Sequence, residues 1–535
     1  MGIENNKKKY RSNLFLYIDG IALIPAISFL KKYNILDQLD KETTDINDLN
    51  KQISSDSGYL AVLLRMLASQ GYINFSNGKY NKRYIKKNSR TKELISISNI
   101  IKKFDINEII EHSINLDNLL FNQKIDTGLQ TYKKLFKTYT EILNTNYSNN
   151  NKYIKRALMN IEGFIIGPIM VAMTINNYWD KETRFIDPQG FNGNKSLFSE
   201  IVSFLITINF LTKSDNKHLF TEKGIFFLKR STAFGVTVSY LRTFRMIREL
   251  VLGNPEKIWN RENGGLETHV DRYMNVWGSG GAHSIYFKKI DYIVKNIFNQ
   301  PIEKQPIGLA DMGCGDGTFL IHLYNLITQN TNRGKYLNSH PLFIIGADFN
   351  LAARDTSKKN LTKNGIDHFI IDADISQPEK YANDLNKITG HKLEDYLNIR
   401  SFIDHNRVYS IPKEISFPHC SSSGTFNYRG RLIPNDEIMQ NLIEHFKTWQ
   451  PYIYKHGLLV LELHTIKPII ASKNIGKTLA TAYDATHGLS DQYIIEHDIF
   501  ISAASYSNLV PVKEYQTLYP NQDMVTVSIN LLKKQ

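Results

Sequence analysis

Residues 307–327 read IGLADMGCGDGTFLIHLYNLI, and this stretch decides the fold of the C-terminal half. A short apolar run is followed by Gly313, Gly315 and Gly317 and then by an amphipathic pattern, which predicts a strand, a tight loop and a helix. Glycines let the backbone of such a loop approach a ligand, and the helix that follows offers free N–H groups. The stretch therefore predicts an α/β fold with a ligand site where its first strand ends.

Two acidic residues define what this loop can bind. Asp311 precedes the first glycine, and the next predicted strand, 342–347, runs into Asp348. An acid at the end of the second strand is placed to accept hydrogen bonds from ribose hydroxyls. The acids at Asp311 and Asp316 would repel an anionic pyrophosphate and attract a cationic ligand.

The sequence Asp311-Met-Gly-Cys-Gly-Asp-Gly resembles motif I of the class I methyltransferases that depend on S-adenosylmethionine (SAM), a cofactor that carries an ammonium and a sulfonium. The resemblance implies a Rossmann-like sheet of seven strands with the last antiparallel, a ribose contact at Asp348, and adenine flanked by Ala373 and Asp374. A polar insertion at 329–341 makes the gap before Asp348 longer than is usual in that family. Further strands are predicted at 398–403, 457–464, 510–519 and 524–532.

Histidines follow two of these strands, His405 after the fourth and His464 at the end of the fifth. Ligands of open α/β sheets lie beyond the carboxyl ends of the strands, so we expect both to face the transferred methyl group as candidate bases, with His487 as a third catalytic candidate. His405, His464 and His487 with Gln492 also offer donors for one divalent ion. An isolated histidine is more often structural, so the catalytic, metal-binding and structural interpretations all stay open.

A second resemblance concerns residues 264–291 (GGLETHVDRYMNVWGSGGAHSIYFKKID), 400–407 (RSFIDHNR) and 486–498 (THGLSDQYIIEHD). They look like parts of the methyltransferases of bacterial polyketide assembly lines. This likeness implies carbon methylation of a malonyl-type acyl group on an acyl carrier protein, polyketide synthase components as partners and, in some relatives, a bound metal such as iron or manganese. Four residues could contact the substrate carboxylate or the cofactor, or instead cap a glycine turn at 278–281: His269, Arg272, Asn275 and His283.

The N-terminal half contains an internal repeat. Ile18-Asp19-Gly20 followed by Pro25 is matched by Ile161-Glu162-Gly163 followed by Pro168, each within an apolar run. A helical pattern and a polar turn follow each copy, which predicts a winged helix twice. We expect a winged-helix-like domain at 1–105, a helical connector at 106–154, a second winged-helix-like lid at 155–284 and the catalytic domain at 285–535.

The first apolar run imitates a signal peptide, but its pattern recurs inside the chain, and Asp19 and Pro25 interrupt it. We therefore expect a cytoplasmic protein that does not enter a membrane. Two cysteines, Cys314 and Cys420, cannot build a disulfide framework, which also fits a reducing compartment.

The chain of 535 residues has a net charge of +13, and more than half of this excess lies in the first 105 residues. Lys82, Arg83, Lys86 and Lys87 lie beside the first wing and suit an acidic carrier protein. The candidate recognition helix at 60–70 carries one basic residue, which disfavours DNA binding. Two rival functions remain: a small-molecule O-methyltransferase, whose family often dimerises through such a region, and a DNA-binding regulator with a vestigial SAM fold.

Overall fold

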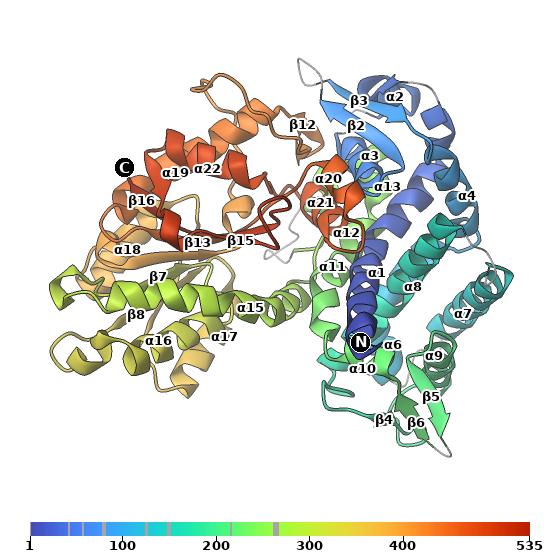
Figure 1. Cartoon of the computed structure of the whole chain (residues 1–535), viewed down its shortest axis with the longest axis horizontal. Coiled ribbons are helices and arrows are strands. Elements are labelled where there is room, and N and C mark those ends of the chain that lie inside the picture. The colour runs from blue at the N-terminus through green and yellow to red at the C-terminus, as the bar shows by residue number, and fades with distance from the viewer. Residues whose placement is uncertain are drawn as a thin grey trace. The chain divides into compact units, whose positions relative to one another are not determined.

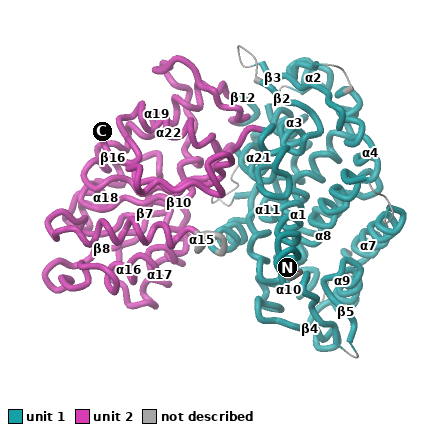
Figure 2. Tube along the Cα trace, viewed as in Figure 1, with its two compact units in different colours: residues 1–282, 429–432, 468–490 teal, residues 283–428, 433–467, 491–535 magenta. Residues whose placement is uncertain are grey.

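The computed structural model describes residues 2–40, 43–55, 58–77, 82–122, 127–146, 151–214, 217–259 and 267–535. The chain forms two compact units (Figure 2). Unit 1 comprises residues 1–282, 429–432 and 468–490, and unit 2 comprises 283–428, 433–467 and 491–535. The segments 429–432 and 468–490 belong to the C-terminal half of the sequence but fold as part of unit 1. No sequence pattern predicted this assignment.

A mostly parallel sheet forms the centre of unit 2 (Figure 1), with strand order β14-β16-β13-β10-β7-β8-β9 and β15 paired with β16. β7 pairs in parallel with β8 and β10, whereas β16 is antiparallel to β13. The predicted Rossmann-like sheet with its antiparallel strand is therefore confirmed, with β15 as an additional strand. The strands are β7 (Gly308–Met312), β8 (Phe343–Asp348), β9 (Phe369–Asp372), β10 (Leu397–Ser401), β13 (Leu458–Leu463), β14 (Leu509–Pro511), β15 (Thr517–Tyr519) and β16 (Val527–Lys534).

Apolar side chains cover both faces of this sheet, because neighbouring residues of a strand point to opposite sides. On one face, Leu309 and Ile399 belong to a buried cluster with α15, α16 and α17, and on the other Ala310 and Val460 pack with α18, α19 and α22. These helices are α15 (Arg272–Phe298), α16 (Thr318–Asn330), α17 (Leu351–Lys363), α18 (Pro378–Thr389), α19 (Asn435–Ile453) and α22 (His497–Tyr506); the small ribbon β11 (Phe426–Tyr428) and β12 (Arg431–Ile433) lies between β10 and α19 in the sequence.

In unit 1 the two copies of the repeat meet where α1 (Gly2–Lys32) packs along α8 (Lys152–Ile175). A Cβ at Gly20 would collide with the backbone of Asn160, and a Cβ at Gly163 would collide with the backbone of Tyr17. The glycine of each copy therefore admits the main chain of the other copy. The repeated acid–glycine pair marks a helix crossing that needs glycine on both sides.

Each copy also carries a small antiparallel wing with the same strand order, β1-β3-β2 in the first and β4-β6-β5 in the second. The predicted duplication of the winged helix therefore appears in the topology. The wing strands are β1 (Thr44–Asp45), β2 (Ile73–Asn77), β3 (Arg83–Lys87), β4 (Phe185–Ile186), β5 (Leu211–Ser214) and β6 (Lys217–Phe220).

The remaining helices of unit 1 include those of the predicted connector, α5, α6 and α7. They are α2 (Ile46–Gln52), α3 (Tyr59–Ser69), α4 (Thr91–Ile101), α5 (Ile106–Ile114), α6 (Leu116–Phe121), α7 (Thr127–Asn146), α9 (Lys195–Thr207), α10 (Glu222–Leu228), α11 (Gly235–Ser239), α12 (Leu241–Arg245), α13 (Ile247–Leu252), α14 (Glu256–Trp259), α20 (Pro468–Lys473) and α21 (Ala480–Gly488).

Two helices, residues 4–32 of α1 and the whole of α8, are long and apolar enough to cross a membrane by length and composition. Their most apolar windows are 78% and 83% buried inside the protein, as in the core helices of a folded domain. Packing within unit 1 thus accounts for their hydropathy.

Candidate cofactor and active site

The glycine loop between β7 and α16 has the conformation that its sequence predicts. Gly313, Gly315 and Gly317 have φ values of +85°, +54° and +78°, in the left-handed region that favours glycine. The N–H groups of Gly313 and Cys314 donate to the carbonyl oxygen of Ala347 at 2.8 and 3.0 Å, which ties the loop to the end of β8. A Cβ at Gly315 would meet nothing within 4 Å, so a ligand can approach the backbone there.

Asp348 lies at the end of β8 and holds the loop in place. Its Oδ2 accepts a hydrogen bond from the N–H of Gly315 at 3.1 Å, and its Oδ1 accepts one from Asn350 at 2.8 Å. A carboxylate has about four acceptor positions, so Asp348 can bind ribose hydroxyls while it orders the loop.

The predicted adenine-flanking residues lie at the same edge. The N–H of Ala373 donates to the carbonyl oxygen of Asp348 at 3.4 Å. The Oδ1 of Asp374 accepts from the N–H of Ser376 at 2.8 Å and shapes the turn after β9. One further residue was not predicted: the ring of Phe349 is 59% exposed directly after the ribose-binding candidate, where an aromatic face is suited to cover adenine. An aromatic residue next to the acid that ends the strand was the available signal.

Asp311 is the unusual carboxylate of this site. Its side chain is 1% exposed, and in the described part of the chain its Oδ1 has no hydrogen-bond partner. Burial, followed by the charge of Asp348, raises the pKa of Asp311 to about 7. Most buried polar atoms are hydrogen-bonded, so an orphaned carboxylate oxygen beside an open glycine loop indicates a ligand that donates to it. The ammonium group of SAM is such a donor, and the residues present fit this cofactor.

A histidine–glutamate pair lies at the carboxyl ends of β10 and β13. The Nδ1 of His405 is 2.6 Å from the Oε1 of Glu462, and both side chains are buried. Because an ionised carboxylate only accepts, Nδ1 carries the proton and the lone pair of the imidazole is on Nε2. The pair therefore has the geometry of an oriented general base; the role of His405 stays a prediction, and Glu462 is a partner that sequence reasoning missed.

A second buried cluster fixes the segment that carries His405. Asp404 accepts hydrogen bonds from Arg400 and, at 2.9 Å, from the Nε2 of His445. Burial alone would raise the pKa of Asp404, but the charge of Arg400 and the hydrogen bond of His445 outweigh it and hold that pKa below its usual value. The guanidinium of Arg400 also lies 4.0 Å from the centre of the Trp449 ring. The buried ion pair of Arg400 and Asp404 thus fixes the segment that carries His405.

His464 does not have the predicted catalytic geometry. Its Nδ1 lies 3.0 Å from the carbonyl oxygen of Ile495, and its Nε2 lies 2.8 Å from the hydroxyl of Ser528. The carbonyl can only accept, so Nδ1 carries the proton and the lone pair of Nε2 is taken by the Ser528 hydroxyl. Burial lowers the pKa of His464 to about 3. His464 therefore links β13, β16 and the segment before α22, which is a structural role.

The predicted metal donors belong to two different units. His487 lies on α21 in unit 1 with its Nδ1 2.8 Å from the carbonyl oxygen of Tyr483, whereas His405, His464 and Gln492 belong to unit 2. Across the described ranges no group of three or more His, Cys, Asp or Glu side chains is arranged to hold a metal ion. With both nitrogens of His464 already bonded, the predicted donor set does not fit a metal, and neither this set nor a catalytic role of His487 gains support.

Three of the four predicted substrate residues, His269, Arg272 and Asn275, lie in unit 1 and have local partners, whereas His283 is the first residue of unit 2. Arg272 donates to both carboxylate oxygens of Glu267, at 2.7 and 2.6 Å, so its charge is compensated. Asn275 donates to the hydroxyl of Ser239 at 3.1 Å, and the buried ring of His269 lies 4.7 Å from that of Trp259. The side chain of His283 lies outside the described residues. The alternative of a glycine turn at 278–281 is wrong, because these residues belong to α15.

The basic face beside the first wing is smaller than predicted. Lys82, Lys86 and Lys87 are exposed, but Arg83 is 3% exposed, and burial lowers its pKa to about 10. All eleven residues of α3, the candidate recognition helix, are buried. This burial leaves α3 no accessible face for the edges of DNA bases.

Three known domain families match parts of the chain. Residues 267–530 match the AprA MT2-like domain family, residues 10–75 the AprA N-terminal domain family, and residues 162–254 the AprA winged helix domain family. Residues 267–530 therefore form a methyltransferase domain of the AprA MT2-like family. Residues 162–254 of the N-terminal region form a winged helix domain.

Several solved structures are similar to this chain, but their sequence identity to it is low. Human N-acetylserotonin methyltransferase in complex with SAM shares 12% identity, with a TM-score of 0.42, over 72% of this chain and 99% of that chain. The CurJ carbon methyltransferase shares 11% identity, with a TM-score of 0.32, over 81% and 100%. The mitomycin 7-O-methyltransferase MmcR shares 9%, with a TM-score of 0.32, over 96% and 94%. Likeness at this level bears on neither substrate nor mechanism. No curated protein sequence matches the chain.

Proposed function

We propose that this methyltransferase alkylates the acidic carbon of a malonyl-type acyl group held on an acyl carrier protein. The observation that carries the proposal is the His405–Glu462 pair, with 2.6 Å between Nδ1 and Oε1, at the carboxyl ends of β10 and β13. A carbon between two carbonyl groups needs a base before it becomes a nucleophile, and an imidazole with its lone pair on Nε2 can supply it.

Each group has a separate task in this scheme. SAM, when bound, supplies an electrophilic methyl group on its sulfonium. Asp311 holds the ammonium end of the cofactor, and Asp348 holds the ribose. His405 takes the proton from the acceptor, and Glu462 stabilises the imidazolium that results. Arg400 and Asp404 keep the segment of His405 in register with the end of β10.

The acidic partner would dock on the exposed lysines of the first wing. Lys82, Lys86 and Lys87 form a cationic face on or beside β3, and carrier proteins are typically acidic. Replacing these three lysines with glutamine should raise KM for a carrier-bound substrate and leave KM for a free thioester analogue unchanged. Equal effects on both substrates would reject the docking face.

The decisive experiment for the function is a methylation assay with malonyl-loaded carrier protein. His405→Ala should lower kcat about 100- to 10,000-fold while the affinity for S-adenosylhomocysteine stays within twofold, because the base acts on the acceptor only. His340→Ala, an exposed histidine of unit 2, is the matched control. Equal loss of turnover and of cofactor affinity would contradict a role as base.

A small-molecule O-methyltransferase remains the rival, since the same pair could deprotonate a hydroxyl. Mass spectrometry separates the two functions. The carbon-methylation proposal predicts a mass gain on the acyl group that survives mild alkaline ester hydrolysis. Turnover of phenolic acceptors without any turnover of the malonyl thioester would overturn it.

A further inference from the structure

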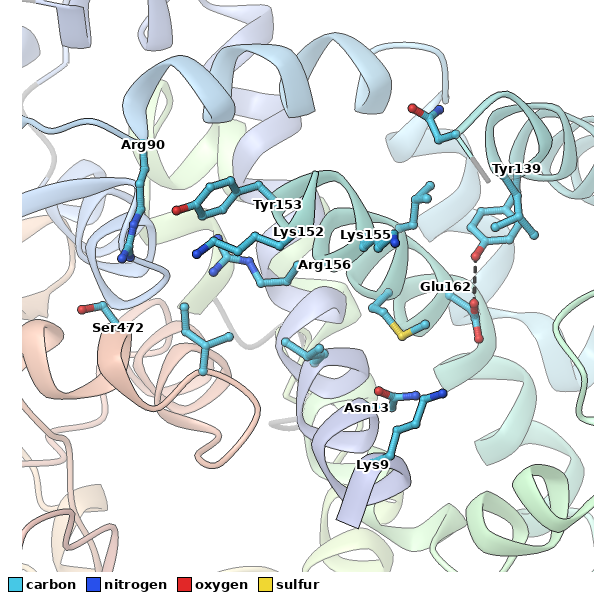
Figure 3. A pocket seen from close by; sticks show the side chains of 16 residues that line it. Lys9, Asn13, Arg90, Tyr139, Lys152, Tyr153, Lys155, Arg156, Glu162 and Ser472 are labelled. Carbon is cyan, nitrogen blue, oxygen red and sulfur yellow. Dashed lines mark hydrogen bonds between the residues drawn. The ribbon is translucent and has the colours of Figure 1, made fainter. Parts of the chain in front are cut away.

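Unit 1 contains a cavity of about 610 Å³ that has no part in the site described above (Figure 3). Side chains from α1, α7, α8 and the segment of α20 line it. Its apolar lining comes from Leu16, Leu143, Leu158, Met159 and Ile475. A volume of this size is typical of sites for small organic ligands.

One side of the cavity gathers positive charge around a single aromatic ring. The guanidinium groups of Arg90 and Arg156 lie 5.9 and 5.6 Å from the centre of the Tyr153 ring, and the ammonium of Lys152 lies 5.2 Å from it. Figure 3 shows these side chains together, with Lys155 farther along α8. Within the described ranges, none of these four cations has a carboxylate oxygen within 4 Å. Like charges so close together repel, and a polyanion would relieve that repulsion.

The acidic groups of this region do not compensate the cations. Glu162 also lines the cavity, but its carboxylate binds the ammonium of Lys223 at 2.9 Å and the hydroxyl of Tyr139 at 2.8 Å. Asp19 accepts from the N–H of Ala482 at 3.0 Å, and burial raises its pKa to about 8, so it is largely neutral at pH 7. The cavity therefore keeps a net positive charge at neutral pH.

Of these cations, Arg156 is held by further contacts. Arg156 stacks 4.7 Å from the centre of the Tyr72 ring and donates to the carbonyl oxygen of Gln70 at 3.2 Å. Lys152 and Tyr153 lie in the first turn of α8, a helix of 24 residues whose N-terminus adds a partial positive charge. The site thus combines a held guanidinium, that of Arg156, with an exposed ammonium at the N-terminal turn of α8.

We propose that this cavity binds a phosphate monoester that carries an apolar chain. The phosphate would lie among Arg90, Lys152 and Arg156, because a dianion matches converging guanidinium and ammonium groups. The chain would lie along the apolar lining near Met159. The ligand could come from a soluble organic phosphate or from a lipid headgroup, which share this chemistry. The proposal is independent of the methyl-transfer reaction.

Calorimetry on the full-length protein tests the site with decyl phosphate below its micellar concentration, inorganic phosphate and decanol. Decyl phosphate should bind saturably and at least tenfold more tightly than either of the other two compounds. Inorganic phosphate lacks the apolar chain, and decanol lacks the phosphate. Lys152→Gln, an exposed residue whose loss leaves packing intact, and Arg156→Gln should each weaken binding of decyl phosphate at least tenfold. Met159→Trp, which fills the apolar lining, should reduce its affinity to that of inorganic phosphate.

The matched control is Lys134→Gln, an exposed lysine of α7 outside the cavity, which should change nothing. Equal affinities for decyl phosphate and inorganic phosphate, or decyl phosphate binding that Lys152→Gln does not weaken, would overturn the proposal. Cosedimentation with phosphatidic acid vesicles that Lys152→Gln abolishes would support the site and assign the phosphate to a lipid. Binding of decyl phosphate without cosedimentation would support the site and assign it to a soluble ester.

Discussion

Glu162 in unit 1 and Asp311 in unit 2 are both buried carboxylates within stretches that the sequence marks as special, yet their surroundings differ. Glu162 has a partner on every side: the hydroxyls of Tyr17 and Tyr139 and the ammonium of Lys223. Asp311 has an oxygen without any hydrogen bond in the described part of the chain. The hydrogen bonds of Glu162 are satisfied by the protein, which suits a role in the fold, whereas Asp311 keeps an oxygen that a ligand can satisfy. The predictions that follow test this distinction.

The largest effect is expected at the crossing of α1 and α8. Gly163→Ala places a methyl group against the backbone of Tyr17, which cannot move aside as a side chain could. We expect a loss of about 4 kcal/mol or more in the free energy of unfolding, at the upper end for a single substitution. Gly280→Ala is the control, because a Cβ at Gly280 meets nothing within 4 Å and alanine favours a helix. Denaturant unfolding measures the free energy of unfolding of both variants. Equal values would contradict a close backbone contact between α1 and α8 at Gly163.

A smaller loss is expected when Glu162 is replaced. Glu162→Gln leaves the ammonium of Lys223 without its counter-charge and should lower the free energy of unfolding by about 2–3 kcal/mol. The affinity for S-adenosylhomocysteine should not change. Glu200→Gln removes the exposed pair with Lys133 at 3.8 Å and should cost less than about 1 kcal/mol. If the Glu162 variant kept its stability but no longer bound S-adenosylhomocysteine, the assignment of Glu162 to the fold and of Asp311 to the ligand would be wrong.

The smallest effect concerns pH. The pKa of Asp311 is raised to about 7, and the ammonium of the cofactor pairs with the ionised carboxylate only. Affinity for S-adenosylhomocysteine should therefore rise about tenfold between pH 6 and pH 8, with proton uptake by the free protein as the cause of the weaker binding at low pH. Calorimetry at several pH values measures this dependence. Asp311→Asn should give a flat profile, and a flat profile of the unmodified protein would argue against the pairing.

The features that could be predicted from the sequence are those that depend on residues close together in the chain. The loop from Asp311 to Gly317 and the order of the strands depend on neighbouring residues, and their prediction holds. The acid–glycine repeat was visible because both copies keep the same motif, although its role as a helix crossing was not.

Features that depend on distant contacts were predicted poorly. His405 pairs with Glu462, which lies 57 positions away on another strand. From the sequence, His464 received the same catalytic interpretation as His405. The hydrogen-bond partners of His464, Ile495 and Ser528, lie 31 and 64 positions away in the sequence. Burial of Arg83 within a run of basic residues is likewise a property of packing rather than of composition.

The most direct test of the account is calorimetry of S-adenosylhomocysteine with Asp311→Asn, together with the thermal stability of the same variant. The account predicts that affinity falls about 10- to 100-fold, because a charge-assisted hydrogen bond is lost, while the melting temperature stays the same or rises, because an unpaired buried carboxylate is removed. Unchanged affinity together with a lower melting temperature would show that Asp311 serves the fold, and would contradict the central claim.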